Sequence, residues 1–338
     1  MTKLTFKAYR LRFTAPLHIS NQRDDSSISL KTIQSDTLYA ALMDCLAKYG
    51  KSLPEDGKFQ FNISSLFPYY EADEPDAKPV FFLPMPLMSR LPELEDVSLA
   101  KKVKKVQWVD STLYGDLLNG VRFFDGKNNK IDWISTSYFT NKQLHKDREG
   151  SYDFIKSEVT QRAAINDRTG QGDAMPYYVE RIMFSGRSGL YFLATGETKQ
   201  LDEALQLLSM EGLGTDRHVG FGYFNIEKDQ LEIHVPDDAN HAVSLSLLIP
   251  ESSGQLKEML ASEDVAYDFT RRGGWITTER DSGLRKNVIY GFLPGSVFKK
   301  KITGIQVLGR VVDLKPEIGN HSVWRDGRAI MLPIKFKQ

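Results

Sequence analysis

The stretch with the most chemical content is GLGTDRHVGFG, residues 212–222, in which four glycines surround an arginine and a histidine. It is not a dinucleotide-binding fingerprint, because GxGxxG would need a glycine where Arg217 stands. It is not a Walker loop either, since that motif places Gly-Lys-Ser/Thr before a helix. Here the glycines follow an expected helix at 201–210 and precede an expected strand. This order differs from that of both nucleotide-binding motifs, so the loop is expected to bind a different ligand.

The glycines predict a place where a ligand can approach the main chain. Gly212 and Gly214 permit positive φ angles, and consecutive backbone N–H groups in such a turn can hold an anion. Gly220 and Gly222 alternate with aromatic residues, which predicts a strand with one bare face for another chain to lie against. On spacing alone, an ordinary helix-ending turn into an edge strand explains these residues equally well.

The charged residues of the loop narrow the ligand class. Arg217 and His218 stand at its crown, and such side chains bind phosphate groups or stack on the bases of single-stranded RNA. The whole chain carries 44 basic and 44 acidic residues. It therefore has no uniform positive field with which to coat a long nucleic acid, and any RNA contact is expected to be local and shaped.

Other kinds of site find little support in the sequence. The single cysteine, Cys45, excludes an internal disulfide and a cysteine-rich metal site. The six histidines have no HxxxH or HExxH spacing, and the acidic stretch 71–76 has no metal-ligand pattern. We expect no metal and no cofactor. Without a signal-peptide pattern or a run of about 18 apolar residues, we also expect a cytoplasmic protein with no membrane partner.

The elements that must position the loop begin with an alternating strand at 4–13 and a polar loop at 14–34. Ser35 is predicted to cap a helix over 36–49, whose apolar residues fall on one face. A proline-rich and acidic connection follows, with one short strand near 79–83.

The middle of the chain predicts more strands. Residues 101–109 are expected to form a basic-faced strand, and 161–180 a strand, a glycine-rich tip and a return strand. A strong strand at 189–194 precedes the helix and the glycine-rich loop. After about residue 230 the pattern restarts with a strand at 241–250, a short helix at 254–264 and three further strands.

The order of these elements predicts the fold class. Each half is consistent with a βαββαβ ferredoxin-like unit, the first one enlarged by insertions. We therefore expect an α+β protein of two ferredoxin-like domains, the first over 1–229 and the second over 230–338.

The chain resembles the RAMP superfamily, the repeat-associated RNA-binding proteins of CRISPR systems. GLGTDRHVGFG, placed after a helix, is similar to the glycine-rich loop of that superfamily. Stretches elsewhere are similar, in the same order, to the subunit that holds the 5′ handle of the CRISPR RNA (crRNA) in type III-A (Csm) effector complexes. They are TAPLHIS (14–20), SDTLYAAL (35–42), ISSLFPYY (63–70), FFLPMP (81–86), RRGGWI (271–276), LPGSVF (293–298) and VWRDGRAIMLP (323–333). The resemblance spans essentially the whole chain.

The resemblance implies a fold and a role. The fold would be two ferredoxin-like, RRM-related domains with a protruding β-hairpin thumb. The protein would be a non-catalytic scaffold in antiviral defence that grips the crRNA 5′ handle. It would contact both the large signalling subunit and the first backbone subunit of the complex, and target cleavage would belong to the backbone subunits.

Two predicted contacts lie near the first strand and the first helix. His18 follows the strand, at a sheet edge where phosphate or ribose contacts are expected, and a solvent-exposed histidine without a ligand is the alternative. Ser35 opens the helix, whose N-terminus is a natural phosphate seat. Capping alone also explains Ser35.

Two other segments extend the predicted RNA path. INDRTGQGDAMPYY, 165–178, resembles the thumb, where Arg162 and Arg168 would reach phosphates and Met175 or Tyr177 would wedge between bases. An exposed hairpin with ordinary surface arginines is the alternative. Residues 271–310 contain nine Lys or Arg against two acids, and a solvated strand face explains them as well as RNA does. Arg285 and Lys286 belong to this basic segment. The residues predicted to contact RNA are His18, Ser35, Arg162, Arg168, Tyr177, Gly212, Gly214, Thr215, Arg217, His218, Gly220, Gly222, Arg271 and Arg272.

Two alternative functions stay open. One is a metal-independent, repeat-processing endoribonuclease with His18 or His218 as general base. The other is the equivalent handle subunit of a type III-B (Cmr) complex. Cleavage of repeat RNA without metal would favour the enzyme, and intact bound RNA would favour the scaffold.

Overall fold

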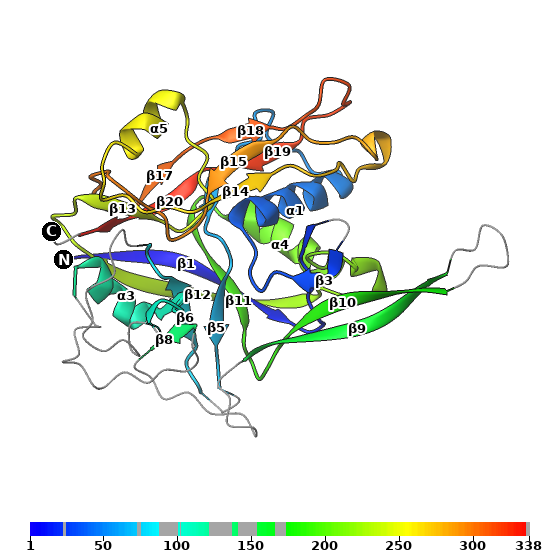
Figure 1. Ribbon diagram of the computed structural model, residues 1–338, viewed down its shortest axis with the longest axis horizontal. Coiled ribbons are helices and arrows are strands. Elements are labelled where there is room, and N and C mark those ends of the chain that lie inside the picture. Colours follow the sequence, from blue (N-terminus) through cyan, green and yellow to red (C-terminus); the bar gives the residue numbers. More distant parts are fainter. Residues whose placement is uncertain are drawn as a thin grey trace.

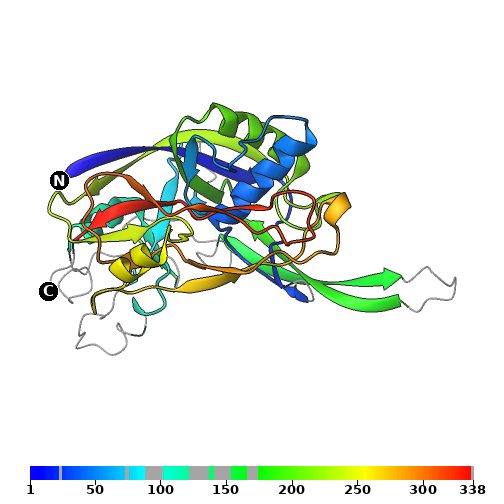
Figure 2. The same ribbon diagram turned by 90° about the horizontal axis from the view of Figure 1, so that it is seen from above.

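The structure is a computed structural model of the 338-residue chain. It describes residues 1–22, 25–72, 76–87, 101, 103–121, 137–140, 154–165 and 174–335. Figures 1 and 2 show a body of sheets and helices from which one long hairpin projects. Among the helices of these residues, none is both long and apolar enough to cross a membrane.

The body is built around one large sheet. Its central strand β1 (Thr2–Phe13) pairs antiparallel with β11 (Gly189–Gly196) on one side and along its whole length with β12 (Phe224–Val235) on the other. The strand order is β12-β1-β11-β5-β6-β7-β8, and β4 also pairs with β11. The remaining strands are β4 (Phe61–Ile63), β5 (Phe67–Tyr70), β6 (Val80–Pro84), β7 (Trp108–Asp110) and β8 (Tyr138–Phe139).

Two apolar cores cover the two faces of this sheet. Tyr9 and Leu11 of β1 face a core formed with α1 (Ser35–Lys48) and α4 (Lys199–Glu211), which lie side by side in Figure 1. Phe6 and Ala8 face the second core, which α3 (Ser111–Leu118) and the C-terminal strands complete. The sequence of β1 predicted a strand with one buried face. In its central part, both faces are buried, because alternate side chains enter the two cores.

The C-terminal part forms a smaller sheet of order β16-β13-β20-β17. Its strands are β13 (His241–Ser244), β16 (Val297–Phe298), β17 (Gln306–Leu308) and β20 (Ala329–Ile334). One helix, α5 (Ser253–Met259), accompanies it. Two short ribbons complete this part: β14 (Phe269–Arg272) with β15 (Ile289–Phe292), and β18 (Val311–Asp313) with β19 (Trp324–Asp326).

The projecting hairpin consists of β9 (Ile155–Ile165) and β10 (Ala174–Phe184), paired antiparallel throughout. This confirms the predicted pair of strands on either side of a tip. A small ribbon of β2 (Ser20–Gln22) and β3 (Asp25–Ser29) supports its base, where the Ser26 hydroxyl donates to Tyr178 O. In Figure 2 the hairpin extends well away from the body. We call it the thumb.

Several predicted elements are confirmed and others are wrong. The strands at 4–13, 79–83 and 189–194 and the helices at 36–49 and 201–210 form as expected, within a few residues. The loop predicted at 14–34 contains β2 and β3. The basic-faced strand predicted at 101–109 is wrong, because among the described residues of this stretch only those of β7 are extended and residue 103 is helical.

The C-terminal part also differs from the predicted order. Within 237–335, α5 is the only α-helix, whereas a βαββαβ unit needs two. The segment after β14 contains three glycines and no helical apolar period, and it forms a ribbon and the short 3₁₀ turn η2 (Glu279–Asp281) instead. The predicted domain boundary at 229/230 falls inside β12, which pairs with β1 on both sides of that point.

Candidate nucleic-acid interface

The glycine-rich loop, residues 212–222, is fixed by the main chain that follows β1. The Thr215 N–H and hydroxyl donate to His18 O at 2.9 and 3.2 Å. Gly212 and Gly214 have φ angles of 82° and 97°, as their sequence predicted. A Cβ at Gly214 would lie 2.5 Å from His18 O, so the glycine is needed for this close approach.

The second half of the loop is closed in the same way. The Gly222 N–H donates to Pro16 O at 2.9 Å, and the Leu213 N–H donates to Gly222 O at 2.9 Å. β12 begins only at Phe224, so Gly220 and Gly222 are not part of a strand. The predicted bare strand face is therefore wrong, because the space over Gly222 is filled by the main chain of Leu213.

The crown of the loop is the part open to solvent. It consists of the 3₁₀ turn η1 (Arg217–Val219) and the residues beside it. His218 is exposed, Val219 keeps 50% of its surface, and Arg217 is half-buried. Gly220 has a φ of 92°, and a Cβ there would meet no atom within 4 Å. Any ligand of the loop must therefore approach from this side.

An ion pair joins the thumb to the loop. Arg162 Nη1 of β9 lies 2.8 Å from an Asp216 carboxylate oxygen, and its guanidinium carbon lies 4.9 Å from the centroid of the Phe221 ring. Asp216 is one of two described non-glycine residues with positive φ. Arg162 was predicted to reach a phosphate. In the structure it holds the crown against the thumb and remains partly exposed.

His18 lies beneath this junction and not on its surface. Its side chain is buried, with 2% of the residue exposed, and its Nδ1 lies 2.7 Å from Glu180 O of the thumb. The solvent-exposed alternative is wrong. Because the ring is covered by the loop and the thumb base, His18 positions Thr215 and Glu180 and has no surface to offer to a phosphate.

The thumb carries exposed apolar and aromatic side chains. Met175, Tyr177 and Tyr178 on β10 are all exposed. Tyr177 pairs across the hairpin with Arg162, so it lies on the part of the thumb nearest the loop crown. Arg168 lies outside the described residues, as does the rest of the tip.

At the start of α1, both polar groups of Ser35 are engaged by other parts of the chain. Gln34 is the N-cap and Ser35 is the first helical residue, so the predicted cap is wrong. The Ser35 N–H donates to Ser65 Oγ, and its own Oγ accepts from Leu247 N–H, both at 2.9 Å. Ser35 is buried because the C-terminal part of the chain covers this end of the helix.

Arg272 is held at the same junction between the C-terminal part and α1. Its Nη2 donates to Asp36 Oδ1 at 3.0 Å, and Asp36 Oδ2 also accepts from Arg325 Nη1 at 3.1 Å. Arg271, the preceding residue of β14, is exposed. The predicted pair of RNA-contacting arginines therefore separates into one inside the molecule and one on its surface. Strand alternation could have signalled this, but the sequence did not single out Asp36 or Arg325.

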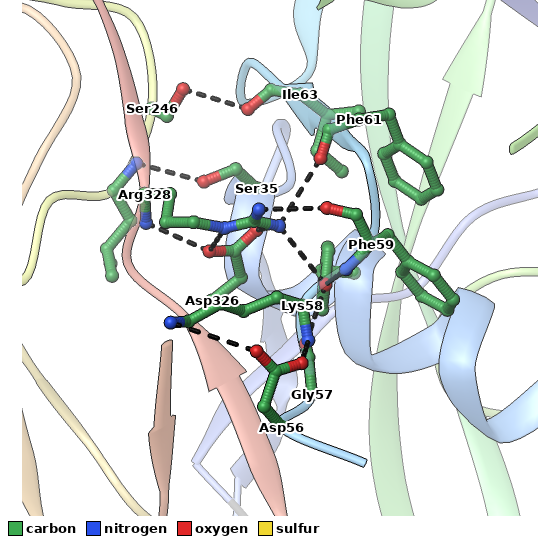
Figure 3. A network of polar contacts seen from close by, with 12 residues as sticks. Ser35, Asp56, Gly57, Lys58, Phe59, Phe61, Ile63, Ser246, Asp326 and Arg328 are labelled. Carbon is green, nitrogen blue, oxygen red and sulfur yellow. Dashed lines mark hydrogen bonds and ion pairs between the residues drawn. The ribbon is translucent and has the colours of Figure 1, made fainter. Parts of the chain in front are cut away.

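A second polar network ties the two parts of the chain together (Figure 3). Arg328 forms an ion pair with Asp326 at 2.9 Å and donates to the carbonyl oxygens of Phe59 at 2.9 Å and Phe61 at 3.3 Å. Nearby, Ser246 Oγ donates to Ile63 O at 2.8 Å. Arg328 thus bonds the C-terminal sheet to the connection between α1 and β4.

The predicted site residues form two groups. The loop, His18, Arg162 and Tyr177 come together where the thumb meets the body, whereas Ser35 and Arg272 lie at the junction with the C-terminal part. Within the described ranges, no cluster of three or more His, Cys, Asp or Glu side chains could hold a metal ion. The arrangement offers a shaped surface with exposed rings, a histidine and a few cations, which suits single-stranded RNA.

Similarity to known proteins covers the chain almost from end to end. Residues 237–334 match the family model of the CRISPR Csm4 C-terminal domain. The chain is 27% identical over 321 residues to the CRISPR system Cms protein Csm4 of Mycobacterium tuberculosis H37Rv, covering 92% of this chain and 93% of that one. It is 27% identical over 337 residues to the protein of the same name from Streptococcus thermophilus, covering 95% and 96%.

Solved structures share the fold. A chain of the Csm3–Csm4 subcomplex in the type III-A CRISPR-Cas interference complex superposes with a TM-score of 0.60 at 18% identity, covering 99% of this chain and 100% of that one. A chain of the Csm1–Csm4 cassette in complex with pppApA gives a TM-score of 0.55 at 18% identity, covering 99% of each chain. The mixed α+β fold of this chain is thus the fold found in those assemblies.

Proposed function

We propose, from the premise that this chain belongs to the Csm4 family, that it holds the 5′ handle of the crRNA in a type III-A CRISPR effector complex. In this role it links a large Csm1-type subunit to a Csm3-type backbone subunit. Solved assemblies whose names pair Csm4 with Csm1 and with Csm3 support both partners. The chain acts as a scaffold and has no catalytic step of its own.

The strand order supports a ferredoxin-like N-terminal domain. The order β12-β1-β11, followed by β4 and β5, with α1 and α4 as the two connecting helices, is that of a βαββαβ unit. We place its end after β12, near residue 236, because the domain cannot end within a strand that pairs along its whole length. The C-terminal domain, 237–338, is a ferredoxin-like unit reduced to one described helix.

The observation that carries the proposal is the joint between thumb and loop. The Arg162–Asp216 ion pair fixes an exposed crown beside a hairpin with exposed aromatic rings. The Arg217 side chain and the open space over Gly220 suit a phosphate, and the rings suit bases. A strand of RNA that follows the thumb onto the body must cross Gly220.

Gly220→Trp should weaken binding of crRNA by about tenfold or more, the loss of roughly one good contact. The indole would occupy the open space from which the strand approaches. The measurement is fluorescence anisotropy with an RNA that carries the repeat-derived 5′ end. A substitution at Gly214 is unsuitable, because a side chain there meets His18 O and disturbs the fold itself.

Gly304→Trp is the matched control. Gly304 also has positive φ with no atom within 4 Å of an added Cβ, but it lies in the C-terminal part. Both variants place a side chain on a backbone with positive φ, at a cost of about 1–3 kcal/mol, and only Gly220→Trp should lose RNA. If the two variants bind the RNA with equal affinity, the crown is not part of the RNA-binding surface.

The scaffold role predicts that the purified chain leaves repeat RNA intact in the absence of metal. His18 is covered on all sides by the loop and the thumb base and cannot act as a general base on RNA. His218 is exposed, so it is the residue to test. If a denaturing gel shows cleavage products that disappear in His218→Ala, the scaffold role is wrong and the protein is an endoribonuclease.

A further inference from the structure

A second group of cations lies where the C-terminal part meets the start of α1. Arg272 comes from β14, Arg325 from β19, and Lys286 from the segment before β15. The carboxylate of Asp36 is fully buried in their midst and binds both arginines, at 3.0 and 3.1 Å. Two arginines therefore share one carboxylate, and Lys286 lies close enough for Asp36 and Arg325 to affect its pKa.

Donors in this cluster outnumber acceptors. The Nε atoms of Arg272 and Arg325 are buried, and neither has a hydrogen-bond partner in the described part of the chain. The Arg325 side chain keeps only 9% of its surface. Lys286 Nζ likewise has no ion pair or hydrogen bond to any described residue. Buried N–H groups without an acceptor are costly, so the cluster is short of an anion.

Lys286 fits least well as a purely structural residue. Burial, together with the charge of Arg325, lowers its pKa to about 8, although Asp36 and Asp44 oppose this shift. A methionine would fill a similar volume without confining a charge. Loss of the proton relieves the unfavourable charge of Lys286, and so does an anion that lies beside the ammonium group.

The main chain next to Lys286 leaves an entrance. Gly274 has a φ of 97°, and a Cβ at this position would meet no atom within 4 Å. Its carbonyl oxygen accepts from Lys286 N–H at 2.9 Å, so the bare residue lies directly across the ribbon from the lysine. An anion can approach over Gly274 without displacing a side chain.

We propose that Arg272, Lys286 and Arg325 bind one phosphate group of a single-stranded RNA that enters over Gly274. The site deepens the proposed function and rests on it. The surface of the same ribbon favours RNA over an acidic protein partner. Phe269 and Tyr290 expose 56% and 57% of their surfaces beside the exposed Arg271, and rings interleaved with cations suit single-stranded nucleic acid.

Lys286→Met is the variant that tests the site. It removes the one cation of this cluster that has no described partner. Asp36 keeps both of its arginines, so the free energy of unfolding should stay the same or rise. Binding of the handle RNA should weaken about tenfold, the loss of one charge-assisted contact. The slope of log K against log salt should become shallower by about 0.7, the value for one phosphate on a single strand.

Two further readouts separate a phosphate contact from a structural effect. In the first, single phosphates of the RNA are replaced by neutral methylphosphonates. One such replacement should weaken RNA binding by the native chain, and the same replacement should not change RNA binding by Lys286→Met. Affinity of the native chain should also fall as pH rises from 7 to 9, because the free lysine loses its proton near pH 8. The variant should lack this fall.

Lys300→Met is the matched control, since Lys300 lies in the same part of the chain but is paired with Glu258 of α5. It should bind RNA as the native chain does. If Lys286→Met binds as tightly as Lys300→Met, the site is overturned while the proposed function stands. A native chain that binds no RNA overturns the proposed function. The site is then judged with inorganic pyrophosphate, which must raise the Tm of the native chain and not that of Lys286→Met.

Discussion

Asp36→Ala should lower the free energy of unfolding by about 3–5 kcal/mol, the range seen when one partner of a buried ion pair is removed. The substitution would leave the buried Arg325 and the half-buried Arg272 at the start of α1 without their shared counter-charge. It would also release the contact that holds β14 and β19 against this helix. Urea unfolding followed by circular dichroism measures the change.

Asp44→Ala provides the control on the same helix. Asp44 is half-buried and forms an ion pair with Lys48, at 3.2 Å and one helical turn away. Such a pair contributes about 0.3–0.5 kcal/mol. Comparable losses in the two variants would mean that the buried position of Asp36 does not matter, and the role given to the cluster would be wrong.

Arg328→Met should produce a loss of similar size, about 3–5 kcal/mol. Arg328 bonds the Asp326 carboxylate and the carbonyl oxygens of Phe59 and Phe61. Burial raises the pKa of Asp326, so this carboxylate depends on Arg328 to remain charged. Without the guanidinium, the buried Asp326 carboxyl loses its ion pair and keeps the backbone N–H of residue 328. The carbonyl oxygens of Phe59 and Phe61 lose the Arg328 donor, and the two parts of the chain lose a direct link.

The double variant Asp326→Leu/Arg328→Met should recover part of this loss, since replacing both partners of a buried pair removes the unpaired charge. Arg310→Met, at an exposed arginine, should change the unfolding free energy by no more than about 0.5 kcal/mol. If Arg328→Met unfolds at the same urea concentration as Arg310→Met, Arg328 does not hold the two parts together.

Local sequence determined several of the elements and one part of the site. The periodicity of 36–49 and 201–210 suffices for α1 and α4, because their apolar residues must share a face. Gly212 and Gly214 fix where the loop must turn, since only glycine takes these φ angles easily. The thumb strands were visible on either side of a polar, glycine-rich tip.

The tertiary structure alone decided which charged residues face solvent. Ser35 and Arg272 resemble surface residues in sequence. Ser35 is buried and the Arg272 side chain keeps only 16% of its surface, because the C-terminal part folds over the start of α1. His18 is covered because the loop and the thumb base close over it. Asp36 and Arg325 are 289 residues apart, and no local pattern encodes their contact. Side-chain type and spacing set what a segment can form, whereas long-range packing sets which cations remain available to a ligand.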